Sequence, residues 1–395
     1  MTTRLRSLIS GFVILLTGCG IPQSTEPKSA IESTAPQQAL ERWSPIDDAR
    51  KLGQPIEHRL GALPLEGEVA QAPWVGSYWP TYLDSINYRW AGPRSESPAR
   101  KYGRAFGVAN VEDKVSRYHG IDSVRGSSCS NYGSCGTGYM CGHRAGREQG
   151  SCLPLWWGMC HGWAAAATLH AEPRHPVVYN GVEFGVSDIK ALLTLSYSTS
   201  STKQIGGRCE RDKSAIPKDR STRPTDPVCR DTNPGTYHLM LTNYVGLQRQ
   251  SFIEDRSIDR DVWNQPIRRY RVLKMHEISQ HKANRVLGVR AGGYAYNPAA
   301  SRFAYVQTEV GYVREATAES DGYLGDSIEK YTFQDVYEYV LELDAAGNVV
   351  GGEWAGTSKL KHPDFLWVCL GPNSSKVAGG AIGFDNVLKL LQMSY

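Results

Sequence analysis

The feature that most limits how this chain can fold is a run of four cysteines in a glycine-rich segment. Cys129, Cys135, Cys141 and Cys152 stand among seven glycines between residues 126 and 150. Glycine adds no side chain to a core, so covalent cross-links have to hold such a stretch in shape. Zinc is the alternative, but no pair of these cysteines has the C-x2-C spacing typical of zinc ligands. We therefore expect disulfides here. Four cysteines allow three pairings, and the sequence does not choose among them.

The N-terminus indicates a compartment in which disulfides persist. Arg4 and Arg6 precede the apolar run 8–16, which is too short to span a bilayer, and small residues then lead to Cys19. This is the layout of a lipoprotein signal peptide, with an ordinary signal peptide and a chance cysteine as the alternative. We expect residues 1–18 to be removed and a lipid-modified Cys19 to anchor the protein in the cell envelope. Gly20 favours the outer membrane of a bacterium, with the protein facing the periplasm or the surface.

The remaining composition bounds the domain organisation and the partners. Residues 19–42 are rich in Pro, Ser, Thr and Gln, so we expect a disordered tether. Residues 43–395 suffice for one large domain or two ordinary ones. The net charge is +4 without a long basic run, so nothing in the sequence calls for a nucleic-acid partner.

The pattern of helix and strand formers predicts an α+β fold. We expect an N-terminal module of short helices and aromatic turns over residues 43–120, and the disulfide-rich segment over residues 121–152. We expect a catalytic core over residues 153–300. A β-rich C-terminal part over residues 301–395 should pack on that core. Alanines 164–167 favour a central helix over 160–171. Alternating side chains predict strands at 237–245, 250–254, 303–308, 331–343 and 365–370.

The most reactive group in this arrangement is the thiol of Cys160. The start of a helix stabilises an anion, which lowers the pKa of a thiol and can also hold an oxyanion. Trp156, Trp157 and Trp163 surround it, and their indoles would exclude water or donate to that oxyanion. A buried structural cysteine in an aromatic core would show the same local pattern.

A thiol nucleophile needs a base. His161 adjoins Cys160, but consecutive residues on a helix point about 100° apart. His238, on its predicted strand, is better placed to reach the sulfur. Asp255 ends the next predicted strand and would orient that histidine, with Asp259 and Asn264 as rivals for this role.

The other cysteines and acidic residues receive structural assignments. Cys209 and Cys229 bracket a polar loop and are predicted to pair with each other, which leaves Cys369 as a buried free thiol. Asp255, Asp259 and Asp261 lie within seven positions but lack an EF-hand pattern, so we assign no metal ligand and expect a solvated acidic turn.

Several motifs together resemble the transglutaminase elicitor family. They are residues 156–163 around Cys160, the segments 182–190 and 231–238, and the aromatic cluster 74–82. The most specific match is 262–268, which resembles a surface peptide sensed as an elicitor in that family and begins with Val262, Trp263, Asn264, Gln265 and Pro266. The chain is thus identified as a bacterial lipoprotein member of the family, with the resemblance covering residues 70–370.

The resemblance implies a fold related to papain-like cysteine proteases and a specific chemistry. The activity implied is that of a protein-glutamine gamma-glutamyltransferase, or transglutaminase: Cys160 forms a thioester with a glutamine side chain and passes the acyl group to a primary amine. His238 then carries over as the base and Asp255 as its orienting acid. The residues themselves require no cofactor, whereas the resemblance brings in Ca²⁺, on which members of the family often depend.

Two other functions use the same residues differently. A cysteine protease or amidase would employ the same Cys-His-Asp site with water as the acceptor. A catalytically idle surface-recognition lipoprotein would keep the fold and use none of the chemistry. The position of the 43–120 module before the nucleophile also raises the hypothesis of a removable pro-segment.

Overall fold

The structure, a computed structural model, describes residues 44–211, 215–218, 224–289, 296–320, 322–373 and 377–395. The predicted signal peptide 1–18, the lipidation site Cys19 and the tether 19–42 lie outside the described residues. Within the described ranges, none of the helices is both long and apolar enough to cross a membrane.

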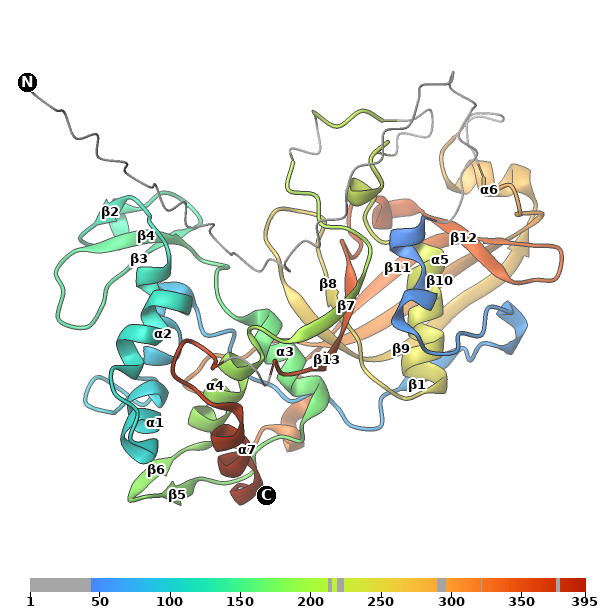
Figure 1. The fold of residues 1–395 in the computed structure, drawn as a ribbon. Helices are drawn as coiled ribbons and strands as arrows, with labels where there is room; N and C mark the ends of the chain where they lie inside the picture. Colours follow the sequence, from blue (N-terminus) through green and yellow to red (C-terminus); the bar gives the residue numbers. More distant parts are fainter. Residues whose placement is uncertain (1–43, 212–214, 219–223, 290–295, 321, 374–376) are drawn as a thin grey trace, which may run out of the picture.

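An eight-stranded antiparallel sheet organises the fold (Figure 1). Its order is β12-β11-β10-β9-β8-β13-β7, and β1 pairs with β9 beside this path. The predicted strands at 303–308, 331–343 and 365–370 are confirmed within β10, β11 and β13. The bounds are β1 Glu66–Glu68, β7 Ser201–Ile205, β8 Ile253–Asp255, β9 Asn264–Ile278, β10 Arg302–Val313, β11 Thr332–Leu343, β12 Val349–Trp354 and β13 Leu366–Gly371.

Helices and two small sheets complete the α+β fold. The helices are α1 Pro98–Phe106, α2 Val111–His119, α3 Cys160–Leu169, α4 Val186–Tyr197, α5 Pro234–Met240, the π-helix Leu241–Leu247, α6 Gln280–Val286 and α7 Phe384–Met393. The small sheets contain β2 Ser128–Cys129, β3 Tyr139–Gly142 and β4 Gly150–Pro154, and β5 Val177–Tyr179 with β6 Val182–Phe184. The 3-10 turns are Pro45–Asp47, Ala49–Leu52, Leu60–Ala62, Thr81–Leu83, Ser85–Asn87, Ile121–Ser123, Tyr132–Ser134, Pro227–Cys229, Gly325–Tyr331 and Gly356–Lys359.

The predicted strand 237–245 is wrong, because this segment forms α5 and the π-helix. Asn233 caps α5 by accepting a hydrogen bond from the Gly235 N–H, and Pro234 occupies the first turn. Both are strong signals for a helix start. Residues 234–245 are buried on every side, and a fully buried segment has no polar face from which its period can be read.

The central sheet separates two hydrophobic cores. One contains Ile253 and Trp367 together with side chains of α1 to α4 and α7. The other contains Phe252 and Leu366 together with α5 and the long strands β9 to β12. Neighbouring residues of one strand therefore enter different cores, as strand geometry requires. In Figure 1 the helices of the first core gather on the left and the strands of the second on the right.

The segment 43–120 contributes to both cores. Leu52, Leu60 and Leu63 pack in the second core, whereas Trp74 and Trp79 are buried in the first. The buried ammonium of Lys190 connects this segment to α4. It lies 5.7 Å from the centroid of the Trp74 ring and donates a hydrogen bond to the carbonyl of Val75 at 2.9 Å. Removing this segment would expose both cores, which argues against the pro-segment hypothesis for the module as a whole.

The predicted disulfides are confirmed, and the structure selects the pairing. Cys129 bonds Cys141 and Cys135 bonds Cys152, which staples the glycine-rich strands β2 to β4. Cys209 bonds Cys229, as the sequence predicted. Cys160 and Cys369 are the two described cysteines outside these bonds, and Cys369 is half-buried rather than buried.

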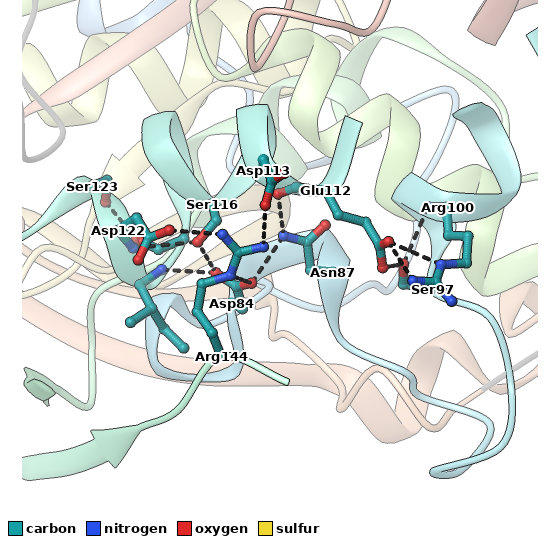
Figure 2. A network of polar contacts seen from close by, with 12 residues as sticks. Asp84, Asn87, Ser97, Arg100, Glu112, Asp113, Ser116, Asp122, Ser123 and Arg144 are labelled. Atoms are coloured by element: carbon teal, nitrogen blue, oxygen red, sulfur yellow. Dashed lines mark hydrogen bonds and ion pairs between the residues drawn. The ribbon is translucent and has the colours of Figure 1, made fainter. Parts of the chain in front are cut away.

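Arg144 fastens this stapled hairpin to the helices beside it. Its guanidinium reaches Asp113 at 2.8 Å, Asp122 at 2.7 Å and Asp84 at 3.5 Å (Figure 2). Asp84 is 7% exposed and also accepts hydrogen bonds from the Ser116 hydroxyl and the Ile121 N–H. One cation therefore joins α2, the turn after it and the loop of Asp84.

Replacing Arg144 should loosen this attachment. Because Arg144→Met leaves the buried Asp84 without its cation, we expect a loss of roughly 1–3 kcal/mol in the free energy of unfolding, measured by denaturant unfolding with the disulfides intact. The matched control is Arg100→Met on the same face (Figure 2), whose partner Glu112 is more exposed. It should cost about 0–1 kcal/mol. Equal losses in both variants would contradict the role of Arg144.

Candidate active site

Cys160 is the first residue of α3, and its side chain faces the central sheet. The predicted helix 160–171 is confirmed over Cys160–Leu169. Gly162 lets α4 approach closely, because a Cβ there would lie 2.3 Å from the carbonyl oxygen of Thr194. Cys160 is 2% exposed, and α3 contacts β9 and β13. The thiol therefore lies buried between helix and sheet.

Strand pairing brings a set of polar side chains to this same face. Asp255 in β8 pairs with Asn264 in β9, and Ile253 pairs with Trp367 in β13. Ile253 and Asp255 are two residues apart, so both point to one face of the sheet, and their paired neighbours point with them. Ile253 and Trp367 belong to the core of α3. Asp255 and Asn264 therefore face Cys160.

Two groups of the 255–264 connection contact the sulfur directly. The Nδ2 amide of Asn264 donates to Cys160 Sγ at 3.3 Å, and Sγ lies 3.6 Å from the carbonyl oxygen of Val262, to which the thiol can donate. The Oδ1 atom of Asn264 accepts from Trp367 Nε1 at 2.7 Å. The sulfur thus has an acceptor for its proton and a donor for its negative charge.

Asp255 is a fully buried carboxyl with one oxygen unused. Its Oδ1 accepts the backbone N–H of Trp263 at 2.9 Å, whereas its buried Oδ2 has no hydrogen-bond partner within the described part of the chain. Burial raises the pKa of Asp255 to about 8, the Trp263 N–H opposes this shift, and the negative charge of Cys160 adds to it. The carboxyl can therefore hold a proton near neutral pH, in the range where a thiol also titrates.

His238 is not brought to Cys160. It lies on α5, which belongs to the core on the opposite face of the sheet. Its Nδ1 lies 2.9 Å from the hydroxyl of Tyr339, which in turn contacts Thr308. Burial lowers the pKa of His238 to about 4, so the ring is neutral at physiological pH. The misplacement follows from the wrong strand prediction at 237–245. His161 points elsewhere too, with Nε2 at 3.2 Å from the Ser198 carbonyl.

The tryptophans predicted to line the site divide into two kinds. Trp163 is fully buried and donates its indole N–H to the Trp74 carbonyl at 3.1 Å, so that N–H is engaged in the core. Trp156 and Trp157 are half-buried and pack edge to face. Their roles in water exclusion stay predictions.

Two aromatic residues of the site were not assigned from the sequence. Tyr78 accepts the Met159 N–H through its carbonyl at 2.6 Å, and its ring packs edge to face on Trp263 at 5.4 Å. Gly158 permits this approach, since a Cβ there would lie 2.6 Å from Tyr78. The cluster at 74–82 was visible in the sequence, but only the fold shows that it borders the thiol. Trp367 gave no signal beyond its place in a predicted strand.

The segment Val262 to Pro266 is not a surface peptide. Val262, Asn264 and Gln265 are each 2% exposed, Pro266 is buried and Trp263 is half-buried. The segment lies beside the thiol and forms the start of β9, and contacts with the surrounding residues bury it. Gln265, for example, donates to Glu315 at 2.7 Å.

Asp259 and the groups of residues that could hold a metal ion have partners within their own segments. Asp259 is exposed, and its Oδ1 accepts from Ser257 and from the Asp261 N–H within one turn. Among the described residues, groups of three close enough to share an ion occur in the cysteine cluster, as Cys129–Cys141–His143 and Cys129–Cys135–Cys152. Their sulfurs are already joined in disulfides.

The fold and the thiol site place the chain among transglutaminase-like α+β proteins. The chain belongs to the transglutaminase elicitor family, whose description, "Transglutaminase elicitor", it matches over residues 49–395. Its fold is similar to the crystal structure of the GP42 transglutaminase from Phytophthora sojae, with a TM-score of 0.73 and 34% sequence identity. That similarity covers 87% of this chain and 95% of the GP42 chain. A comparison with curated proteins finds no match.

The raised pKa of Asp255 predicts a specific pH dependence of stability. An aspartate in the unfolded chain titrates near 3.8, so between about 4 and about 8 the folded state holds a proton that the unfolded state has lost. The stabilisation is complete below about 4 and disappears as the pH rises toward 8. Asp255→Asn removes this dependence. The denaturation midpoint of the variant, relative to that of the wild type, should therefore increase as the pH rises from about 4 to about 8. A difference that does not change with pH would contradict the assignment.

Proposed function

We propose that this protein is a transglutaminase in which Cys160 is the nucleophile and Asp255, rather than a histidine, transfers the protons. The observation that carries the proposal is the buried Asp255 carboxyl. It faces the thiol at a helix N-terminus, has one oxygen without a hydrogen-bond partner in the described chain, and has a pKa raised to about 8. The family and the GP42 likeness support acyl transfer as the reaction.

Acylation begins from the ionised form of Asp255, which is the minor form near neutral pH and grows as the pH approaches the carboxyl's pKa of about 8. Its Oδ2 takes the proton from Cys160 Sγ, which leaves a thiolate and a neutral carboxylic acid. Asn264 Nδ2, 3.3 Å from the sulfur, stabilises the thiolate charge. The thiolate attacks the γ-carboxamide carbon of a glutamine side chain. The negative oxygen that forms lies at the positive end of α3.

The tetrahedral intermediate collapses by breaking its carbon–nitrogen bond. Asp255 returns its proton to the leaving nitrogen, so ammonia departs and Cys160 keeps the acyl group as a thioester. In the second half, the Asp255 carboxylate takes a proton from an incoming primary amine, such as a lysine side chain. The amine attacks the thioester, and the product is an isopeptide bond with the thiol restored.

The surroundings favour an amine over water in the second half. The site is buried, and Trp263 packs on Tyr78 at its border. Apolar walls exclude water from the thioester and strengthen the electrostatic contacts inside. A hydrolase would use the same residues, and it differs in releasing the free glutamate side chain instead of the isopeptide.

An exported location for this chemistry is part of the proposal. The three disulfides fit an oxidising compartment. We infer from the sequence that a lipid on Cys19 holds the enzyme at the cell envelope, where glutamine-bearing proteins and amines would be its substrates. Cys19→Ser should then release the protein from the membrane fraction, and unchanged fractionation would contradict the anchor.

The central test is incorporation of a fluorescent primary amine into a glutamine-bearing protein, with and without Ca²⁺. Cys160→Ala should abolish incorporation, and Asp255→Asn should lower its rate by about 10²–10⁴-fold, because an amide cannot take up the proton. His238→Gln should retain activity to the extent that it folds, since its ring lies across the sheet from the thiol.

Two matched controls separate chemistry from folding. Glu254 is the neighbour of Asp255 on β8, is equally buried and has its pKa raised to about 8, but it faces the other core and accepts from Tyr237. Glu254→Gln should change the rate by only a few-fold, and Cys369→Ala should leave it unchanged. Activity that survives Cys160→Ala would overturn the proposal. Ammonia release without amine incorporation would replace it with the hydrolase.

A further inference from the structure

Trp367 touches the thiol site through one intermediary. Its indole N–H donates to Asn264 Oδ1 at 2.7 Å, and the other end of that amide, Nδ2, donates to Cys160 Sγ at 3.3 Å. Trp367 and Asn264 are 4% and 2% exposed. Three side chains from β13, β9 and α3 therefore form one buried chain of hydrogen bonds that ends on the sulfur.

Because the indole N–H can only donate, it fixes which end of the Asn264 amide faces Cys160. A primary amide presents an oxygen at one side and an N–H group at the other, and it can turn over within the same space. The indole N–H can only donate, so it has to meet the amide oxygen. That choice turns the amide nitrogen toward Cys160. In the reversed orientation two N–H groups would face each other and the amide oxygen would face the thiolate.

We propose that Trp367 is a positioning residue of this site: its indole N–H holds the Asn264 amide in the orientation that stabilises the Cys160 thiolate. Its influence on the reaction rests on the proposed function, whereas its influence on the thiol does not. Trp367 acts through Asn264 and does not touch the sulfur.

The strand register explains why a tryptophan stands here. Trp367 is paired with Ile253, while Asn264 is paired with Asp255, so Trp367 and Asn264 are diagonal neighbours separated by the short strand β8. Because β8 lies between the two strands, neighbouring strands being about 4.8 Å apart, only a long side chain reaches from β13 to Asn264. An indole spans this distance and carries a donor at its edge, whereas a phenylalanine spans it without the donor.

The test is the pKa of the Cys160 thiol in the full-length chain. It is obtained from the pH dependence of thiolate ultraviolet absorbance, as the difference between each protein and the same protein with Cys160→Ala. Trp367→Phe should raise this pKa by about one unit, because the amide is then free to turn and a charge-assisted hydrogen bond is weakened. If Trp367→Phe does not fold, Trp367→Met, which fills irregular space, should give the same rise.

A double-mutant cycle distinguishes positioning from general disturbance of the core. In an Asn264→Ala background, Trp367→Phe should add almost nothing to the thiol pKa, since the group it orients is gone. The matched control is Trp354→Phe, which removes another buried indole donor, bonded to the Thr232 carbonyl at 2.9 Å in the other core. It should leave the thiol pKa unchanged.

The outcomes separate this inference from the proposed function. An unchanged thiol pKa in Trp367→Phe, or equal rises with and without Asn264, overturns the role of Trp367 even if amine incorporation depends on Cys160. Conversely, the predicted rise together with amine incorporation that survives Cys160→Ala would keep the hydrogen-bond chain and reject the transglutaminase proposal.

Discussion

The burial of the Asp255 carboxyl against the first turn of α3 is the interaction on which the site depends. A carboxyl in water would be ionised and weakly basic at neutral pH. Enclosed between helix and sheet, the same group has a pKa of about 8 and can exchange a proton with a thiol. The helices of the first core therefore help to set this pKa, because they bury this one side chain.

Strand alternation decides which of two similar carboxyls lies on the same face of the sheet as the thiol. Glu254 and Asp255 are consecutive, both are fully buried, and burial raises the pKa of each to about 8. Glu254 points into the core of α5 and bonds Tyr237, whereas Asp255 points to α3. A shift of one residue in the register of β8 would exchange them and remove the carboxyl from the thiol.

The sequence predicted the parts of the site that local chemistry determines. Cys160 at a helix start, Asp255 at a strand end, the presence of disulfides in the cysteine cluster and the Cys209–Cys229 bond could be inferred from residue type, spacing and compartment, whereas the pairing within the cluster could not. His238 could not be excluded, because helix α5 is buried on all sides and its apolar pattern has no distinctive period. Trp367 could not be found, because its role depends on the diagonal register of β13 and β9 across β8, which no local pattern encodes.

The segment 255–264 shows how residues that pack around a buried thiol can look like a recognition motif. Within these residues the chain supplies the Asp255 carboxyl, the Val262 carbonyl, the Trp263 N–H and the Asn264 amide, and each of these groups contacts the thiol or the carboxyl beside it. A displacement of this segment by about 1 Å would disturb these contacts together. The sequence of 262–266 is then specified by the geometry around Cys160, and any recognition of this segment by another molecule would have to read the few atoms that Trp263 leaves exposed.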